Sequence, residues 1–401
     1  MKRIAIVTQR CHESVVGGSE ALAWQYARLL GGRFEVEILT TTATDCVSWA
    51  NALPAGATQR EGIAIQRFPT VFERGEYWYE LHRRLMLEVQ PHLAPPPCLW
   101  RAAQQEEYIR FQGPYCPALE DWLLAHRGDY AAVLFCTYLY APSYFGIRLI
   151  GPRRAILIPT LHDEVPAWLP VYAARYAAFP HRIWLTEAER RTATRLWGLD
   201  GGAVLGMAVE QAQASAPASL GAPYLLYCGR IDAAKGCDEL LDAFARLPGR
   251  DRAKLVFTGS DHLGLPKHPW IEYHGFVDEA RKRALMAGAA GFVLPSRYES
   301  FSIVALEAMA QGTPVLVNGH CEVMREHIET SAGGYCYTDT AQMIERMTTL
   351  LALDAPARAR MGAAGRAYVL ARYGEDTVRA RLVDCVEGVI AAADRAQASA
   401  A

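Results

Sequence analysis

Residues 291–319, GFVLPSRYESFSIVALEAMAQGTPVLVNG, carry the pattern that decides the fold. The apolar run at their start predicts a short buried strand that ends at Pro295, and IVALEAMAQG predicts a helix that stops at Gly312. Glu299 then lies on the connecting loop and Glu307 lies inside the helix. Such a turn at the carboxyl edge of a parallel sheet is where α/β folds bind ligands, and the free N–H groups of a helix N-terminus suit phosphate. Two carboxylates beside a phosphate site would hold hydroxyl groups, so the stretch predicts a ligand that carries both.

The same alternation of short apolar runs and helical patterns extends over the whole chain, which is typical of parallel α/β units. The expected strands of the first half are RIAIV, EVEILT, IAIQRF, AAVLF, AILIPT and RIWLT, and those of the second half are YLLYC, KLVFTG, IEYHGF, GFVLP, PVLVN and GGYCY. Two open sheets in tandem leave a cleft between them. We therefore expect an α/β fold of two similar domains that face a cleft.

Composition along the chain predicts the domain boundaries. Residues 207–222 are rich in Ala, Ser, Gln and Pro, which predicts a linker between domains over 1–206 and 223–374. Residues 375–401 carry an apolar stripe at helical spacing, and we expect a helix that braces the two domains. Residues 71–117 fit no simple α/β unit and are expected to form an insertion near the mouth of the cleft.

Overall composition and charge exclude several classes of protein. The 401 residues are 51% hydrophobic and 21% charged with a net charge of −2, which fits a soluble chain of two domains without a basic footprint for nucleic acid. MKRIAIVTQR predicts a first strand and not a secretory signal, and no apolar run has the length of a membrane span. The ten cysteines form no C-x-x-C pair, which fits a reducing cytoplasm.

A second candidate for chemistry is CGRIDAAKG, residues 228–236, where a strand is followed by a glycine turn. Arg230 and Lys235 lie on this turn, five residues apart. Arg offers a planar fork and Lys a mobile point charge, so both could stabilise a leaving diphosphate. An isolated pair of this kind is more often two solvated cations on a loop. The second phosphate-compatible turn in the same sheet, at Glu299, favours the ligand.

Two weaker candidates lie in the first half. Gly17 and Gly18 precede an expected helix from Ser19, where the absence of side chains would admit a phosphate to the backbone, although such a pair is more often only a turn. His162 follows a strand in IPTLHDE and could hydrogen-bond a reacting sugar, with an ordinary loop as an equal alternative. Adjacent residues after a strand point in different directions, so HDE is poorly spaced for a metal.

Missing motifs narrow the chemistry further. The sequence contains no G-x-G, no Walker loop before Lys235 and no D-x-D pair to hold a divalent cation on a nucleoside diphosphate. We therefore expect neither a metal nor a permanently bound cofactor. Positive charge for a leaving diphosphate must then come from Arg230, Lys235 and helix N-termini.

These motifs resemble those of a known family. CGRIDAAKG, FTGS, HGFV and the paired glutamates of ESFSIVALEAMAQGTPV are similar to the motifs of the family 4 retaining, nucleotide-sugar-dependent glycosyltransferases. The resemblance is strong over residues 222–335 and thinner in the first half, where GGSE and LHDE match in place and order. It implies the GT-B fold of two tandem Rossmann-like domains facing a cleft, with the acceptor domain over 1–206 and the donor domain over 223–374.

The resemblance also implies roles for individual residues. Glu299 would contact the donor sugar, Glu307 would contact the ribose hydroxyls, and His162 would approach the donor sugar. Against the diphosphate it places Arg230, Lys235, Gly17, Gly18, Ser300, Phe301, Ser302 and Ile303.

Two segments depart from the family pattern. The loop after the first glutamate often reads Gly-Phe-Gly, whereas here residues 300–302 read Ser-Phe-Ser. This variant should still present the N–H groups of Ser302 and Ile303 to phosphate. The run NGHCEVMREH stands in place of a small Gly-rich run, which changes the expected wall near the donor sugar.

By this resemblance we expect a retaining, metal-independent hexosyltransferase that uses a UDP-sugar or GDP-sugar. No nucleophile is evident, so front-face substitution is the expected mechanism. The acceptor would be a glycan or lipid-linked glycan in bacterial-type surface glycan synthesis, lipopolysaccharide or exopolysaccharide, or else a small-molecule natural product. We expect a cytoplasmic protein. Peripheral contact with the inner membrane face through residues 76–87 or 148–154 is an alternative to packed elements with solvated arginines.

Two other functions are compatible with the same architecture. One is a sugar-nucleotide epimerase or a phosphorylase, and a phosphorylase would need a lysine for pyridoxal phosphate. The other is a catalytically silent partner that only binds or activates another transferase. The presence of both glutamates and both cations argues against a silent copy.

Overall fold

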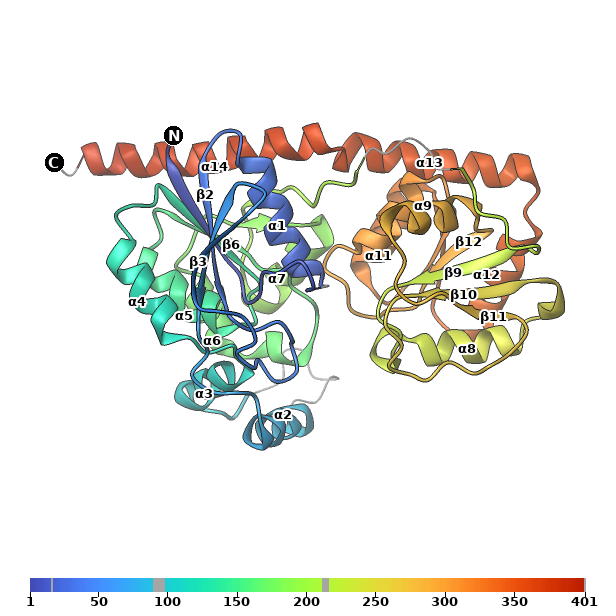
Figure 1. Ribbon diagram of the computed structural model, residues 1–401, viewed down its shortest axis with the longest axis horizontal. Helices are drawn as coiled ribbons and strands as arrows, with labels where there is room; N and C mark the ends of the chain where they lie inside the picture. Colours follow the sequence, from blue (N-terminus) through green and yellow to red (C-terminus); the bar gives the residue numbers. More distant parts are fainter. Residues whose placement is uncertain (16, 89–97, 211–215, 400–401) are drawn as a thin grey trace. The chain divides into compact units, whose positions relative to one another are not determined.

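The computed structural model describes residues 1–401 except 16, 89–97, 211–215 and 400–401. The chain divides into two compact units (Figure 1). The N-terminal unit comprises Met1–Met207 with Arg379–Ala401, and the C-terminal unit comprises Ala208–Val378. Of the expected linker, residues 211–215 lie outside the described residues.

The N-terminal unit is built on a six-stranded sheet of order β3-β4-β2-β1-β5-β6. All neighbouring strands pair in parallel except β3 and β4, which are antiparallel. Its strands are β1 (Arg3–Val7), β2 (Glu35–Thr41), β3 (Gly56–Arg60), β4 (Ile63–Phe68), β5 (Ala132–Cys136) and β6 (Ala155–Ile158), and a separate parallel pair comprises β7 (Ile183–Trp184) and β8 (Ala203–Val204). The edge strand β3 was not predicted, because it is largely exposed and lacks an apolar run.

The helices of this unit are α1 (Gly18–Leu30), α2 (Glu76–Glu88), α3 (Ala102–Gln112), α4 (Pro117–His126), α5 (Ala141–Ile150), the 3-10 helix Val165–Trp168, α6 (Pro170–Tyr176) and α7 (Glu187–Trp197). The segment expected to be an insertion contributes α2 and α3, and residues 89–97 within it lie outside the described residues. The apolar face of α2, formed by Trp78, Leu81 and Leu85, is buried in the core of the unit. Those three side chains are therefore not free to enter a membrane.

The C-terminal unit has a fully parallel six-stranded sheet of order β11-β10-β9-β12-β13-β14. Its strands are β9 (Tyr224–Cys228), β10 (Lys254–Thr258), β11 (Ile271–Tyr273), β12 (Gly291–Leu294), β13 (Val315–Asn318) and β14 (Gly334–Tyr337). Its helices are α8 (Cys237–Ala245), α9 (Glu279–Gly288), α10 (Ile303–Ala310), α11 (Glu322–Ser331), α12 (Thr340–Ala352) and α13 (Ala355–Tyr373), with 3-10 helices at Ala233–Lys235 and Arg250–Arg252. The central strands β9 and β12 are buried along their whole length, as continuous apolar runs predict.

The last helix, α14 (Glu375–Ala398), buries the apolar stripe that the sequence predicts, including Leu382, Val386 and Ile390. Most of α14 belongs to the N-terminal unit, where Asp394 pairs with Lys2 at 2.7 Å. Its expected role as a brace between the units stays a prediction. In the part of the chain that the structure describes, no helix combines the length and the apolar character that crossing a membrane requires.

Candidate active site

The central strands of the C-terminal sheet mark the candidate site. From β9 the sheet grows through β10 to β11 on one side, and from β12 it grows through β13 to β14 on the other. Open α/β sheets bind ligands outside the carboxyl ends of the strands at such a switch point. The loops after β9 and β12 both leave this edge, and they carry most of the residues that the sequence predicts for the site.

The loop after β9 brings two cations to this edge. Lys235 Nζ lies 2.8 Å from Glu299 Oε1, and these side chains are 29% and 18% exposed. Arg230 donates to Asp232, whose other carboxylate oxygen accepts the backbone N–H of Lys235 at 2.8 Å and so caps the short helix Ala233–Lys235. The structure therefore joins Lys235 and Glu299, which stand 64 positions apart in the sequence. It also adds Asp232, which the sequence argument did not single out.

The two loops pack closely where Gly236 meets Pro295. Gly236 has φ +73, and a side-chain carbon built on it would stand 3.0 Å from both the Cβ and the carbonyl oxygen of Pro295. Glycine is the residue that takes this left-handed conformation without strain. This contact fixes the loop that carries Lys235 against the strand end that leads to Glu299.

The turn into α10 exposes backbone donors. Ser302 precedes the helix in a left-handed conformation, φ 66 and ψ 55, and Phe301 before it is buried. Among the described residues, the N–H groups of Ser302, Ile303 and Val304 have no hydrogen-bond partner. The first N–H groups of a helix lack internal partners and carry its positive end, so this turn can receive an anion.

Glu307 lies inside α10, as predicted, while Glu299 lies on the loop. The Glu307 carboxylate pairs with Lys282 of α9 at 3.0 Å, and Lys282 also pairs with Glu279 at 2.9 Å. Burial raises the pKa of Glu307, and the Lys282 ammonium opposes that rise. Lys282 therefore sets how much negative charge Glu307 carries, although no sequence motif pointed to it.

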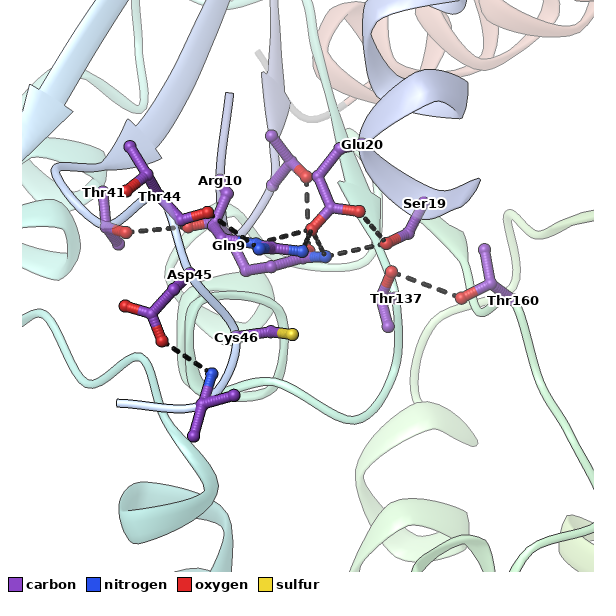
Figure 2. Close-up of polar contacts among 12 residues, drawn as sticks. Gln9, Arg10, Ser19, Glu20, Thr41, Thr44, Asp45, Cys46, Thr137 and Thr160 are labelled. Atoms are coloured by element: carbon purple, nitrogen blue, oxygen red, sulfur yellow. Dashed lines mark hydrogen bonds and ion pairs between the residues drawn. The ribbon is translucent and has the colours of Figure 1, made fainter. Parts of the chain in front are cut away.

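In the N-terminal unit, a polar network gathers at the carboxyl end of β1 (Figure 2). Arg10 Nε donates to Glu20 Oε1 at 2.8 Å, and Gln9 Nε2 donates to the same oxygen at 3.0 Å. Gln9 also donates to Ser19 Oγ at 2.7 Å. Glu20, Gln9 and Arg10 are buried, so the charges of Arg10 and Glu20 neutralise one another inside the unit.

This network explains Gly17 differently from the sequence argument. A side-chain carbon on Gly17 would stand 2.2 Å from Glu20 Oε2 and 3.5 Å from an Arg10 nitrogen, whereas nothing lies within 4 Å of one on Gly18. Gly17 therefore makes room for the carboxylate of Glu20 and not for a ligand phosphate. Only Gly18, the first residue of α1, has the open surroundings that a ligand approaching the backbone requires.

Two threonines follow β5 and β6 with unusual backbones. Thr137 has φ 71 and Thr160 has φ 51, and their hydroxyl oxygens lie 3.2 Å apart (Figure 2). A β-branched residue rarely takes positive φ, and such strain concentrates at functional sites. Both residues lie at the same sheet edge as the Gln9–Arg10–Glu20 network, but local sequence gave no signal for them.

His162 lies two residues beyond Thr160 on a loop held by a buried carboxylate. Glu189 accepts the N–H of Leu161 at 2.7 Å and that of Leu185 at 2.5 Å, and burial raises its pKa to about 8. His162 Nδ1 lies 3.9 Å from Glu164, which is too long for a hydrogen bond.

Its neighbour Asp163 points to other partners. It pairs with Arg195 at 2.9 Å and accepts from Trp168 Nε1 at 2.7 Å. Within the described ranges no group of three or more His, Cys, Asp or Glu side chains could hold a metal ion.

Comparison with known proteins gives these observations a family context. Residues 209–368 match the profile of the family described as "Glycosyl transferases group 1". An uncharacterized glycosyltransferase of Methanocaldococcus jannaschii is 37% identical over 116 residues, 26% of this chain and 30% of that protein. A phosphatidyl-myo-inositol mannosyltransferase of Mycobacterium leprae is 31% identical over 236 residues, 54% of this chain and 61% of that protein. The chain thus spans less than two thirds of the length of these relatives.

Solved structures show similarity over nearly the whole chain. A sucrose-phosphate synthase of Thermosynechococcus elongatus matches with a TM-score of 0.71 over 98% of this chain and 100% of that one, at 17% sequence identity. At this level of identity the similarity concerns the fold alone. It confirms the predicted α/β architecture of two Rossmann-like domains.

Proposed function

We propose, from the premise that residues 209–368 belong to the group 1 glycosyl transferases, that the chain transfers a hexose-type sugar from a nucleoside diphosphate sugar to an acceptor hydroxyl. The observation that carries the proposal is the contact between Lys235 and Glu299, 2.8 Å apart at the switch point of the C-terminal sheet. A cation and a carboxylate side by side match a ligand that joins an anionic diphosphate to a sugar rich in hydroxyl groups.

In this proposal each group receives the part of the donor that suits its chemistry. Lys235 and Arg230 take the diphosphate, together with the N–H groups of Ser302 and Ile303 at residues 300–303, where the loop enters α10. Glu299 accepts hydrogen bonds from hydroxyls of the transferred sugar. Glu307 accepts them from the ribose, with its charge maintained by Lys282.

The proposed reaction is a front-face substitution with retention. The bond between the anomeric carbon and the leaving phosphate oxygen breaks, and a bond from the acceptor oxygen to the same face of that carbon forms. The acceptor proton passes to the leaving phosphate oxygen. Fixed donors at the diphosphate stabilise the negative charge that develops there, which supports a transfer that requires no divalent cation.

The roles of Gly17, Gly18 and His162 toward the same donor belong to this proposal. The open surroundings of Gly18 support its part. Gly17 already serves Glu20, so its effect on a ligand would be indirect. His162 is 30% exposed and its Nδ1 lies 3.9 Å from Glu164, too far for a hydrogen bond, which supports a contact between its ring and a sugar hydroxyl.

The proposed acceptor is a surface glycan or its lipid-linked precursor, with a small-molecule natural product as the alternative. Peripheral contact with an anionic membrane is proposed at an open pocket of about 750 Å³ in the N-terminal unit. Four arginines line this pocket, Arg127, Arg148, Arg153 and Arg154. The segment 151–154 immediately precedes β6, which places the pocket at the opposite edge of the sheet from His162. Cosedimentation with anionic vesicles at increasing salt tests this contact.

The experiment that tests the function begins with a thermal-shift panel of UDP- and GDP-sugars. A donor that binds the native state raises its stability. With the donor so found, we expect slow hydrolysis without acceptor, transfer with retention by NMR, and full activity in the presence of EDTA.

Variants at the two glutamates complete the test. Glu299→Ala should abolish transfer without weakening nucleotide binding, and Glu307→Ala should weaken nucleotide binding about tenfold through lost ribose contacts. The exposed Glu345→Ala serves as the matched control. Full activity in Glu299→Ala would overturn the assignment.

A further inference from the structure

His327 on α11 is buried behind the turn that leads into α10. It is 2% exposed, and both ring nitrogens have partners. Nε2 lies 2.9 Å from the carbonyl oxygen of Phe301, and Nδ1 lies 2.8 Å from the hydroxyl of Tyr368. A carbonyl oxygen can only accept, so Nε2 carries the ring proton and Nδ1 accepts from Tyr368. Burial lowers the pKa of His327 to about 4, which keeps this neutral ring dominant at neutral pH.

The carbonyl that His327 holds belongs to the peptide between Phe301 and Ser302. In a trans peptide the C=O and the following N–H point in opposite directions. Because His327 draws the Phe301 oxygen toward itself, the N–H of Ser302 must point away from His327. That N–H has no hydrogen-bond partner among the described residues.

The observed orientation of this peptide is not the relaxed one. Ser302 has φ 66 and ψ 55, a conformation that is unfavourable for an L-residue. Rotation of the 301–302 peptide by half a turn would bring φ of Ser302 back to a negative value. The same rotation would turn the N–H inward and present a carbonyl oxygen in its place. A backbone in such a conformation persists only when its surroundings hold it.

Three contacts hold it here. One is the hydrogen bond from His327, and the others are the edge-to-face packing of the buried Phe301 ring on Tyr373 and on the His327 ring, with ring centroids 5.0 Å and 6.0 Å apart. The ring packing fixes the side chain of Phe301 but leaves the peptide plane free to turn. The hydrogen bond is the contact that determines which way the plane faces.

We propose that His327 is a positioning residue for phosphate recognition: by holding the Phe301 carbonyl it aims the Ser302 N–H at the diphosphate of the donor. This inference rests on the proposed function, because it assigns the anion at this turn to the donor. A fixed N–H donor requires no reorganisation when charge develops on the phosphate, whereas the rotated peptide would oppose that charge with a carbonyl oxygen.

A purely structural role for His327 would affect stability but would not discriminate between ligands with and without phosphate. The test therefore compares the affinity of a nucleoside diphosphate with that of its nucleoside, UDP with uridine and GDP with guanosine, by calorimetry on the full chain. His327→Phe keeps a ring but removes the hydrogen bond, and His327→Gln places an amide donor near the position of Nε2. Tyr368→Phe is the control, because it removes one hydrogen bond from the same ring but not the one to Phe301.

We expect His327→Phe to lower the affinity for the nucleoside diphosphate about 10- to 100-fold, as for a lost hydrogen bond to a charged group, and to leave the affinity for the nucleoside unchanged. The affinities of His327→Gln and Tyr368→Phe for both ligands should stay within a few-fold of those of the wild type. Adding Ser302→Gly to His327→Phe should restore part of the loss, because glycine takes positive φ without strain.

Equal weakening of both ligands, or of neither, in His327→Phe would overturn the inference while leaving the proposed function intact. Failure of the wild-type chain to bind any nucleoside diphosphate would instead refute the proposed function, and this inference with it. If His327→Phe does not fold, His327→Asn repeats the test with an amide too short to reach Phe301.

Discussion

Acidification should destabilise the C-terminal unit through the single side chain of His327. The unfolded chain takes up a proton on this ring near pH 6.5, whereas the folded chain does so only near pH 4, because burial lowers the pKa of His327 to about 4. Between these values the unfolded state binds more protons, so the free energy of unfolding falls as the pH falls. Above pH 6.5 this contribution is fully present. From pH 7.5 to pH 5 its loss amounts to about 2 kcal/mol.

The assay is urea unfolding of the wild type and His327→Gln at both pH values, followed by hydrogen exchange of the amides in α11. Those amides report on the C-terminal unit alone. Glutamine does not titrate, so on acidification the wild type should lose about 2 kcal/mol more free energy of unfolding than the variant does. Parallel losses in both proteins would show that His327 is protonated in the native state without penalty. The assignment of Nδ1 as the acceptor from Tyr368 would then be wrong, because a charged ring donates from both nitrogens, whereas Nε2 would still donate to Phe301.

Three further outcomes follow from other contacts. Glu189 should act in the opposite sense: its pKa of about 8 in the folded chain, against 4.5 unfolded, gives stability that is fully present below pH 4.5 and falls by about 3 kcal/mol by pH 7. Glu189→Gln should flatten that part of the pH profile in urea unfolding. Lys282→Met should make nucleotide affinity fall on acidification, because the buried Glu307 then protonates more easily. A ratio of variant to wild-type nucleotide affinity that calorimetry finds independent of pH would contradict this. Gly236→Ala should cost about 1–2 kcal/mol from its positive φ and weaken a nucleoside diphosphate by displacing Lys235, which thermal unfolding and binding measurements would detect.

Local sequence determines much of this fold because its strands are buried on both faces. The run YLLYC predicts a strand at 224–228, and β9 occupies Tyr224–Cys228. The turn from β12 into α10 likewise follows from an apolar run, two punctuating prolines and a glycine, which is why Glu299 was expected on a loop and Glu307 in a helix. The exposed edge strand β3 gives no such signal, since its pairing with β4 comes from the tertiary structure.

The site is less visible in sequence because its contacts join distant segments. The Lys235–Glu299 pair and the partnership of Glu307 with Lys282 depend on how β9, β12, α9 and α10 pack. The explanation of Gly17 is similar: only the structure shows that a carboxylate three residues later occupies the space beside it.

The Lys235–Glu299 pair also implies that recognition of the sugar and of the diphosphate are coupled. In the structure these two charges pair with one another at 2.8 Å. A diphosphate that draws Lys235 away leaves a partly buried carboxylate beside new negative charge, which is unfavourable unless Glu299 finds hydrogen-bond donors. Hydroxyl groups of a sugar supply them. A nucleoside diphosphate without its sugar therefore binds with a penalty in free energy that the intact sugar donor avoids. Replacing the Glu299 carboxylate by a neutral side chain should narrow the difference in affinity between the nucleoside diphosphate and the intact donor.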